Sequence, residues 1–143
     1  MTINEKQDSI VEEFSIFDDW MDRYQQLIEY GKELPPIAEQ KKTQQYLIQG
    51  CQSKVWLDAE LRDGKIYFTA DSDAIITKGI VSLLIKVLSG HTPDEILNTE
   101  LYFIDKIGLK ENLSPTRSNG LVAMIKQMKA YALAFKAKIE GNS

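Results

Sequence analysis

The residue with the clearest chemical potential is Cys51, the only cysteine among 143 residues. One thiol cannot close an intrachain disulfide. It also cannot alone supply the three or four ligands that zinc or an iron–sulfur cluster takes. It can act as a single nucleophile or as a covalent carrier. The alternative is a small buried hydrophobe, the usual state of a free cysteine.

The neighbours of Cys51 favour an accessible loop over a buried position. Gln49, Gly50, Gln52 and Ser53 surround the thiol, and polar residues with glycine are typical of loops. Gly50 lets the backbone turn without a side chain that would block the sulfur. A thiol on such a loop can be reached by another molecule, as a reactive cysteine requires.

Two cations are candidates for stabilising a Cys51 thiolate. Lys54 follows three residues later, and Arg117 qualifies if the start of the last helix lies beside the loop. The thiolate is the nucleophile, and an unperturbed thiol with a pKa of about 8.5 is mostly protonated at neutral pH. The alternative for each cation is a solvated surface side chain.

A second chemical candidate is His91, the only histidine. If it met Cys51 in space, the pair would favour a cysteine-dependent hydrolase or transferase. Nothing else in the sequence supports that pair. Asp71 and Asp73 could be paired carboxylates, but a helix cap accounts for at least one of them without catalysis.

Composition excludes several classes of protein. The net charge is −4 with no run of basic residues, which disfavours binding to nucleic acid or to an anionic membrane. The apolar stretches are far shorter than a membrane span. Residues 1–5 contain no apolar segment, so we expect no export signal, and an unpaired thiol fits the reducing cytoplasm. We expect residues 1–143 to form a single cytoplasmic domain.

The elements that must position these residues follow from local patterns. Thr2 to Glu5 has the form of a capping box, so a first helix is expected to about Phe14. A second helix is expected to start within 15–18 and to stop at Gly31 and the prolines at 35–36. Residues 35–45 are expected to form a polar connection.

In the middle of the chain, apolar and polar residues alternate as they do in the strands of a β-hairpin. Residues 55–61 and 66–70 are predicted strands around an Asp63-Gly64 turn, and residues 46–48 are a possible short third strand. The run 71–73 predicts a strong cap for a central helix that starts near Ala74 and ends at Gly90. Gly79 inside this helix is expected to allow close packing against the sheet.

The rest of the chain is predicted to be helical. Short helices are expected at 93–98, capped from Thr92, and at 101–107, and a last helix from Ser114-Pro115 to Gly141-Asn142. Its predicted core stripe comprises Leu121, Met124, Ile125, Met128, Ala132, Phe135 and Ile139. The expected fold is α+β, a small antiparallel sheet of two to three strands packed against N-terminal and C-terminal helices.

Three sequence blocks in this order resemble the SufE family of sulfur acceptors that partner cysteine desulfurases. They are IQGCQSKVWL at 48–57, DSDAIITKG at 71–79 and LSPTRSNGL at 113–121. Trp20, Tyr24, Gly31 and Leu34-Pro35 also fit, so the resemblance spans nearly the whole chain.

The resemblance implies a fold shared with IscU-type scaffold proteins and a SufS-type cysteine desulfurase as partner. It implies that Cys51 takes the persulfide sulfur of the desulfurase. The protein would thereby stimulate that enzyme, and it would then deliver the sulfur to a SufB-containing iron–sulfur scaffold complex. The chain would then be a carrier and not an enzyme. Pyridoxal phosphate would belong to the desulfurase, and this chain would need no cofactor or metal.

The resemblance also assigns supporting roles. Arg117 and Asp73 would contact the partner or stabilise the thiolate. From the flexibility that Gly50 gives the loop, we further expect the sulfur to tuck against apolar residues in the free protein and the loop to extend to reach the cleft of the desulfurase. The supporting loop would comprise Gln49, Gly50, Gln52, Ser53 and Lys54.

Overall fold

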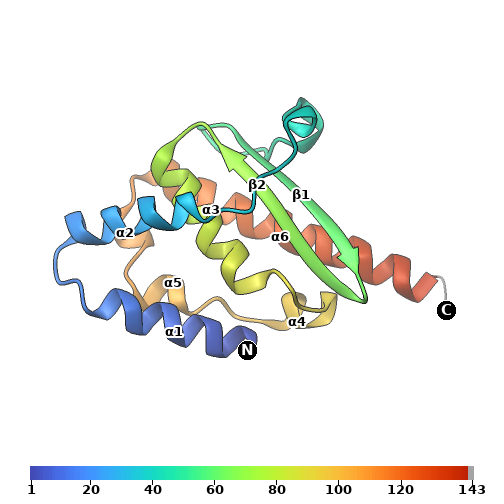
Figure 1. Ribbon diagram of the computed structural model, residues 1–143, viewed down its shortest axis with the longest axis horizontal. Coiled ribbons are helices and arrows are strands. Elements are labelled where there is room, and N and C mark those ends of the chain that lie inside the picture. Colours follow the sequence, from blue (N-terminus) through green and yellow to red (C-terminus); the bar gives the residue numbers. More distant parts are fainter. Residues whose placement is uncertain (142–143) are drawn as a thin grey trace.

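The computed structural model describes residues 1–141 and begins with two helices, α1 (Ile3–Ser15) and α2 (Trp20–Lys32) (Figure 1). Thr2 and Glu5 form the predicted capping box at the start of α1. The cap of α2 is Asp19, whose carboxylate accepts a hydrogen bond from the amide of Met21. The second helix therefore starts just after the predicted window.

The predicted hairpin is confirmed as strands β1 (Val55–Arg62) and β2 (Lys65–Ser72), paired antiparallel. Arg62 pairs with Lys65, which leaves Asp63 and Gly64 as a two-residue turn. Their φ angles are 52° and 78°, and the type I′ turn that suits a twisted hairpin requires two positive values.

The possible third strand at 46–48 does not form, and the sheet has two strands. A 3₁₀ turn at Gln44–Tyr46 comes first, and only a single bridge joins Leu47 to Trp56. Gly50, with a φ of 95°, then turns the chain away before a ladder can form. The connection at 35–45 also contains a 3₁₀ turn at Glu39–Lys41.

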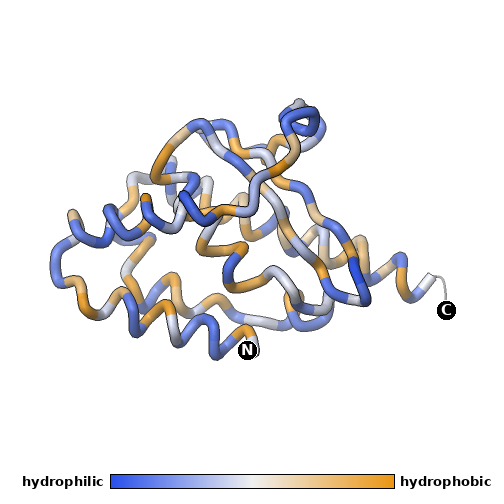
Figure 2. The backbone as a smooth tube through the Cα atoms, in the orientation of Figure 1, coloured by the Kyte–Doolittle hydropathy of each residue, from blue (hydrophilic) through white to orange (hydrophobic). Residues whose placement is uncertain are grey.

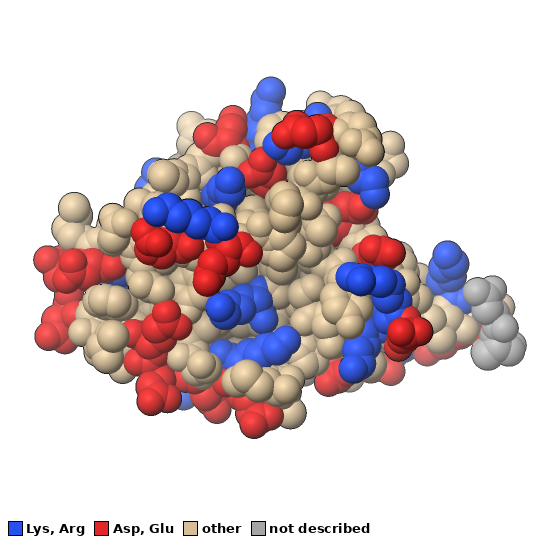
Figure 3. All heavy atoms as spheres, viewed as in Figure 1, with Lys and Arg blue, Asp and Glu red and all other residues tan. Residues whose placement is uncertain are grey.

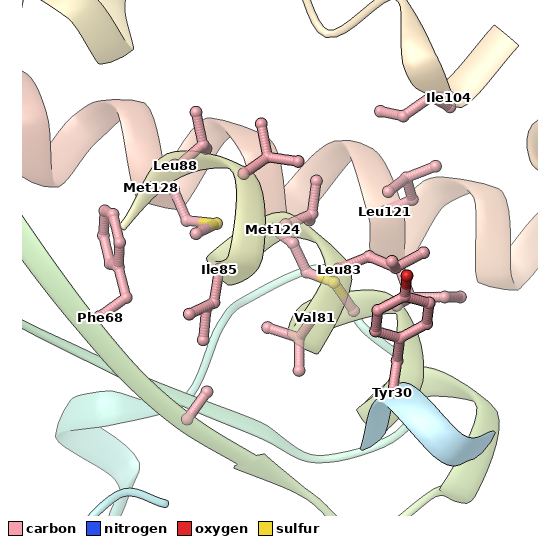
Figure 4. Packing of buried hydrophobic residues seen from close by; sticks show 14 of the residues in the cluster. Tyr30, Phe68, Val81, Leu83, Ile85, Leu88, Ile104, Leu121, Met124 and Met128 are labelled. Carbon is pink, nitrogen blue, oxygen red and sulfur yellow. The ribbon is translucent and has the colours of Figure 1, made fainter. Parts of the chain in front are cut away.

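The centre of the molecule is helix α3 (Ile75–Leu88), which contacts α1, α2, α6 and β2. Figure 2 colours most of this helix as hydrophobic, and ten of its residues are buried. Figure 4 shows side chains of α3 packed with Met124 and Met128 of α6. The predicted central helix is confirmed, and so is the core stripe of the last helix at Leu121, Met124, Met128 and Ala132.

The reason predicted for Gly79 is wrong. A Cβ atom at this position would lie 2.1 Å from the carbonyl oxygen of Leu27. The close packing is therefore against helix α2 and not against the sheet.

The cap predicted for α3 is also wrong. The N-cap residue is Ala74, without a side-chain cap, and the hydroxyl of Ser72 accepts a hydrogen bond from its amide. Asp71 forms ion pairs with Lys42 at 2.6 Å and with Lys78 at 3.4 Å. Lys42 precedes Asp71 by 29 residues and Lys78 follows it by seven. Ion pairs with these lysines therefore hold the carboxylate that a local rule assigned to the helix cap.

The C-terminal part consists of α4 (Pro93–Asn98), α5 (Phe103–Lys106), a 3₁₀ turn at Lys110–Asn112 and the long helix α6 (Pro115–Gly141). In the predicted stripe of α6, Ile125 and Phe135 are only partly buried and Ile139 is 43% exposed. Ile139 lies in the last turn of α6, and Figure 1 shows that this end of the helix runs past the hairpin. The predicted stop at Asn142 lies outside the described residues.

The architecture is α+β with a two-stranded antiparallel sheet, as expected. Within residues 1–141 no helix is long and apolar enough to cross a membrane. Figure 3 shows basic and acidic side chains interspersed over one face, with acidic ones gathered at the end where α1 passes into α2.

Candidate functional site

Cys51 lies on a loop that is closed at its base by backbone hydrogen bonding. The amide of Ile48 donates to the carbonyl of Val55 at 2.9 Å, so residues 49–54 form the loop between them. Gly50 has a φ of 95°, and a Cβ atom there would lie 3.3 Å from the Cβ of Ala123. Both the backbone conformation and the neighbouring helix therefore favour glycine before the cysteine.

The thiol of Cys51 is partly buried against helix α6. Its Sγ donates a weak hydrogen bond to the carbonyl oxygen of Gly120 at 3.6 Å. A Cβ atom at Gly120 would lie 3.5 Å from this sulfur. The absence of a side chain at Gly120 thus leaves room beside the sulfur.

Burial raises the pKa of the Cys51 thiol, and burial is the whole cause of the shift. No nearby charge opposes this effect, and the expectation that Lys54 or Arg117 promotes ionisation stays a prediction. The thiol is therefore protonated at neutral pH, and it becomes a good nucleophile only when its surroundings change.

A cavity of about 360 Å³ opens beside Cys51. Its walls come from the cysteine loop, the first part of α3 and the start of α6. Arg117 is the only residue of the lining with a fixed charge. The lining comprises Cys51, Gln52, Ser53, Thr77, Ile80, Ser114, Thr116, Arg117, Gly120 and Met124.

The structure brings some of the predicted site residues together and separates others. Gln52, Ser53 and Arg117 line the cavity with Cys51, whereas Gln49 and Lys54 do not. Lys54 is exposed.

Asp73 fastens the end of the cysteine loop to the start of α3. Its Oδ1 accepts a hydrogen bond from the amide of Lys54 at 3.0 Å, and its own amide donates to the Lys54 carbonyl at 3.2 Å. Its role here is therefore to hold the loop, a third possibility beside partner contact and thiolate stabilisation.

His91 lies at the other end of the hairpin. Its carbonyl accepts a hydrogen bond from the amide of Ile66, beside the turn, whereas the Cys51 loop precedes Val55 at the open end. The strand between them spans about 20 Å. The Nδ1 of His91 instead faces the carboxylate of Glu95 at 3.4 Å. The structure thus gives no Cys–His catalytic pair.

Several residues that line the cavity are not among the site residues predicted from the sequence. Thr77 belongs to the second block that resembles the SufE family, and Ser114, Thr116 and Gly120 belong to the third. All three blocks therefore meet at one cavity. A signal was present in Gly120, because a glycine inside a helix costs about 1 kcal/mol relative to alanine and needs a reason.

The described part of the chain holds no group of three or more histidine, cysteine or acidic residues that could bind a metal ion. What the site offers is one partly buried thiol, an adjoining cavity and a nearby guanidinium group. This arrangement suits covalent carriage on sulfur.

Comparison with known proteins gives consistent results. Residues 8–132 match the SufE model, described as an Fe-S metabolism associated domain. An uncharacterised SufE-like protein of Synechocystis is 44% identical over 127 residues, which cover 89% of this chain and 80% of that protein. SufE-like protein 1, chloroplastic/mitochondrial, of Arabidopsis thaliana is 40% identical over 139 residues, covering 96% of this chain but 38% of that longer protein.

A solved structure shares the fold. The solution structure of a hypothetical protein from Thermus thermophilus matches with a TM-score of 0.74 and 25% identity, over 90% of this chain and 94% of that one. The family model and the relatives agree on one family, and the solved structure shares the fold. The chain belongs to the SufE family, whose members are sulfur-transfer proteins of iron–sulfur metabolism.

Proposed function

We propose that this protein accepts a sulfur atom on Cys51 from the persulfide of a SufS-type cysteine desulfurase and thereby stimulates that enzyme. It then delivers the sulfur to a SufB-containing scaffold complex. The observation that carries the proposal is the sole thiol, held on a glycine loop beside a cavity with room for another atom. Pyridoxal phosphate belongs to the desulfurase in this scheme, and the carrier needs no cofactor.

The reaction is an exchange between sulfur atoms. The Cys51 thiolate attacks the terminal sulfur of the donor persulfide, a new S–S bond forms, the donor S–S bond breaks and the donor cysteine leaves as a thiolate. No external oxidant or reductant is consumed. Burial of the product in the cavity would protect it from solvent and oxidants.

Acceptance requires the loop to move. In the free protein Cys51 Sγ faces Gly120, and burial keeps it protonated. The contacts that hold the loop are few, chiefly this weak hydrogen bond and the two between Lys54 and Asp73. Docking on the desulfurase would extend the loop, bring the sulfur into a more polar environment and raise its thiolate fraction.

The test is the intact mass of the protein after incubation with desulfurase and cysteine. We expect the mass of one added sulfur atom, removed by reductant and absent in Cys51→Ser. His91→Ala should still accept sulfur, because His91 makes its contacts at the other end of the hairpin. Lack of any gain in the wild type would overturn the proposal, and loss of acceptance in a folded His91→Ala would favour the cysteine-dependent enzyme.

A further inference from the structure

The residue that gives the cavity a specific chemistry is Thr77, in the first turn of α3. Thr77 is 6% exposed and lines the cavity together with Cys51. Its hydroxyl makes no hydrogen bond to any residue within 1–141. In that part of the chain the only fully enclosed side-chain N or O atom without a partner is His91 Nε2. The Thr77 hydroxyl is therefore unpartnered and not fully enclosed, in a residue that lines the cavity.

The surroundings of this hydroxyl favour an anion. The first turn of α3 supplies Thr77, and the first turn of α6 supplies Thr116 and Arg117 to the same cavity. Helix N-termini carry partial positive charge and attract negative groups. Cys51 and Arg117 are the only titratable residues of the lining, so no carboxylate opposes an anion there.

The anion that the proposed function places in this cavity is the persulfide of Cys51. Its terminal sulfur lies about 2 Å beyond Sγ, and a persulfide is a stronger acid than the parent thiol. The carbonyl of Gly120, which now faces the sulfur, is an acceptor and cannot stabilise an anion. A hydrogen-bond donor is needed, and a threonine hydroxyl can provide one.

Resting on the proposed function, we propose that the Thr77 hydroxyl donates a hydrogen bond to the terminal sulfur of the Cys51 persulfide and positions that anion in the cavity. Thr77 is thus a positioning residue that favours retention of the persulfide as an anion. It takes no part in breaking or forming the S–S bonds.

The experiment uses inorganic polysulfide as the sulfur donor. The Cys51 thiolate attacks one end of the polysulfide dianion, an S–S bond of the donor breaks, and a polysulfide dianion shorter by one sulfur leaves. Charge and electrons balance, and the species with one added sulfur is identified by intact mass. The rate at which iodoacetamide alkylates the terminal sulfur is then measured against pH, and its midpoint reports the apparent pKa of the persulfide.

The variants separate the hydroxyl from the shape of the side chain. Thr77→Val keeps the volume without the donor, and we expect its midpoint to rise by about one pH unit, the effect of one hydrogen bond to a charged group. Thr77→Ser keeps the donor and should match the wild type. Arg117 is present in all variants, so its charge does not contribute to the difference. If Thr77→Val does not fold by circular dichroism, Thr77→Ala is compared with Thr77→Ser, from which it differs only by the hydroxyl.

The outcomes distinguish the two proposals. Equal midpoints in Thr77→Val and the wild type would overturn the role of Thr77 while leaving sulfur carriage intact. A Thr77→Ser midpoint equal to that of Thr77→Val would also overturn it, since the methyl group and not the hydroxyl would then matter. A wild type that gains no sulfur, from polysulfide or from desulfurase with cysteine, would instead overturn the proposed function.

Discussion

At the scale of single residues, burial and not charge decides the state of Cys51. The thiol packs against Gly120, and burial alone raises its pKa. Arg117 lines the same cavity, but its side chain is exposed, where solvent screens its charge. The thiol is therefore a poor nucleophile while its sulfur is buried.

The reactivity of Cys51 should therefore depend on folding. Alkylation of the folded protein by iodoacetamide should rise with pH around a midpoint above about 8.5, the ordinary value for a thiol. In urea-unfolded protein the midpoint should return to that value. Mass spectrometry at a series of pH values measures both, and the single cysteine makes the signal unambiguous. Identical midpoints would contradict the effect of burial.

At the scale of elements, two glycines inside helices have different reasons to be there. Gly79 lets α3 approach α2, where an added Cβ would lie 2.1 Å from the backbone oxygen of Leu27. Gly120 faces Cys51, where an added Cβ would make an ordinary contact of 3.5 Å with Sγ. The first glycine is needed for packing, and the second leaves space for the sulfur.

Alanine at these two positions should change the free energy of unfolding in opposite directions. Gly79→Ala should lower the free energy of unfolding by about 3 kcal/mol, because backbone cannot yield to the added methyl group. Gly120→Ala should raise it by up to about 1 kcal/mol through helix propensity, while it narrows the space beside the sulfur and slows sulfur acceptance. Urea unfolding of both variants checks the stability, and a stable Gly79→Ala would refute the packing argument.

Asp73, which lies between β2 and α3, also holds the Cys51 loop in place. Asp73→Ala removes the acceptor for the Lys54 amide, so alkylation of Cys51 should become severalfold faster at a cost of about 1 kcal/mol in stability. Alkylation rates and urea unfolding provide the measurement.

Asp63→Asn is the matched control for Asp73→Ala. It removes a carboxylate at the far end of the hairpin and keeps a residue suited to the positive φ of 52°. Its alkylation rate should equal that of the wild type. Unchanged alkylation in Asp73→Ala would show that Asp73 does not restrain the loop.

At the level of the whole molecule, the edge of β2 that does not pair with β1 is hydrogen-bonded to other parts of the chain at two points. Near one end Ala70 exchanges hydrogen bonds with the segment 35–37, and near the turn Ile66 exchanges them with Gly90 and His91. His91 is 6% exposed, and its Nε2 has no partner within the described chain. It is therefore a structural residue whose protonation would strain this second junction.

The stability of the fold should accordingly fall in mild acid. Burial first, and then the charge of Lys6, lower the pKa of His91, against an opposing effect of Glu95. The unfolded chain then binds a proton more readily than the folded one, so the stability is complete above about pH 6.5 and is lost as the pH falls through that value. Urea unfolding between pH 8 and about 5.5 measures the loss.

The variant His91→Gln tests whether this residue causes the loss. The chain has no other histidine, so the variant should show a nearly flat profile over the same range. Carboxylates titrate at lower pH and remain in both proteins. Equal slopes in the variant and the wild type would assign the pH dependence to other groups.

Rules that act over a few residues were reliable in this chain. The capping box at Thr2, the helix cap at Thr92 and the turn at Asp63-Gly64 formed as predicted, because each needs only partners within three residues. Predictions failed where a distant group competed with the local one for the same side chain. Lys42 and Lys54 took the carboxylates of Asp71 and Asp73, which the local rule had assigned to a helix cap.

The amino-acid sequence alone predicts a single thiol on a polar glycine loop and a resemblance to sulfur acceptors of the SufE family. The depth of the sulfur, the cavity that it shares with Thr77 and the distant position of His91 emerge only when the chain is folded. The physical reason is distance along the chain. The contact that buries Cys51 is with Gly120, 69 residues away, and no local preference specifies which residues so far apart will pack together.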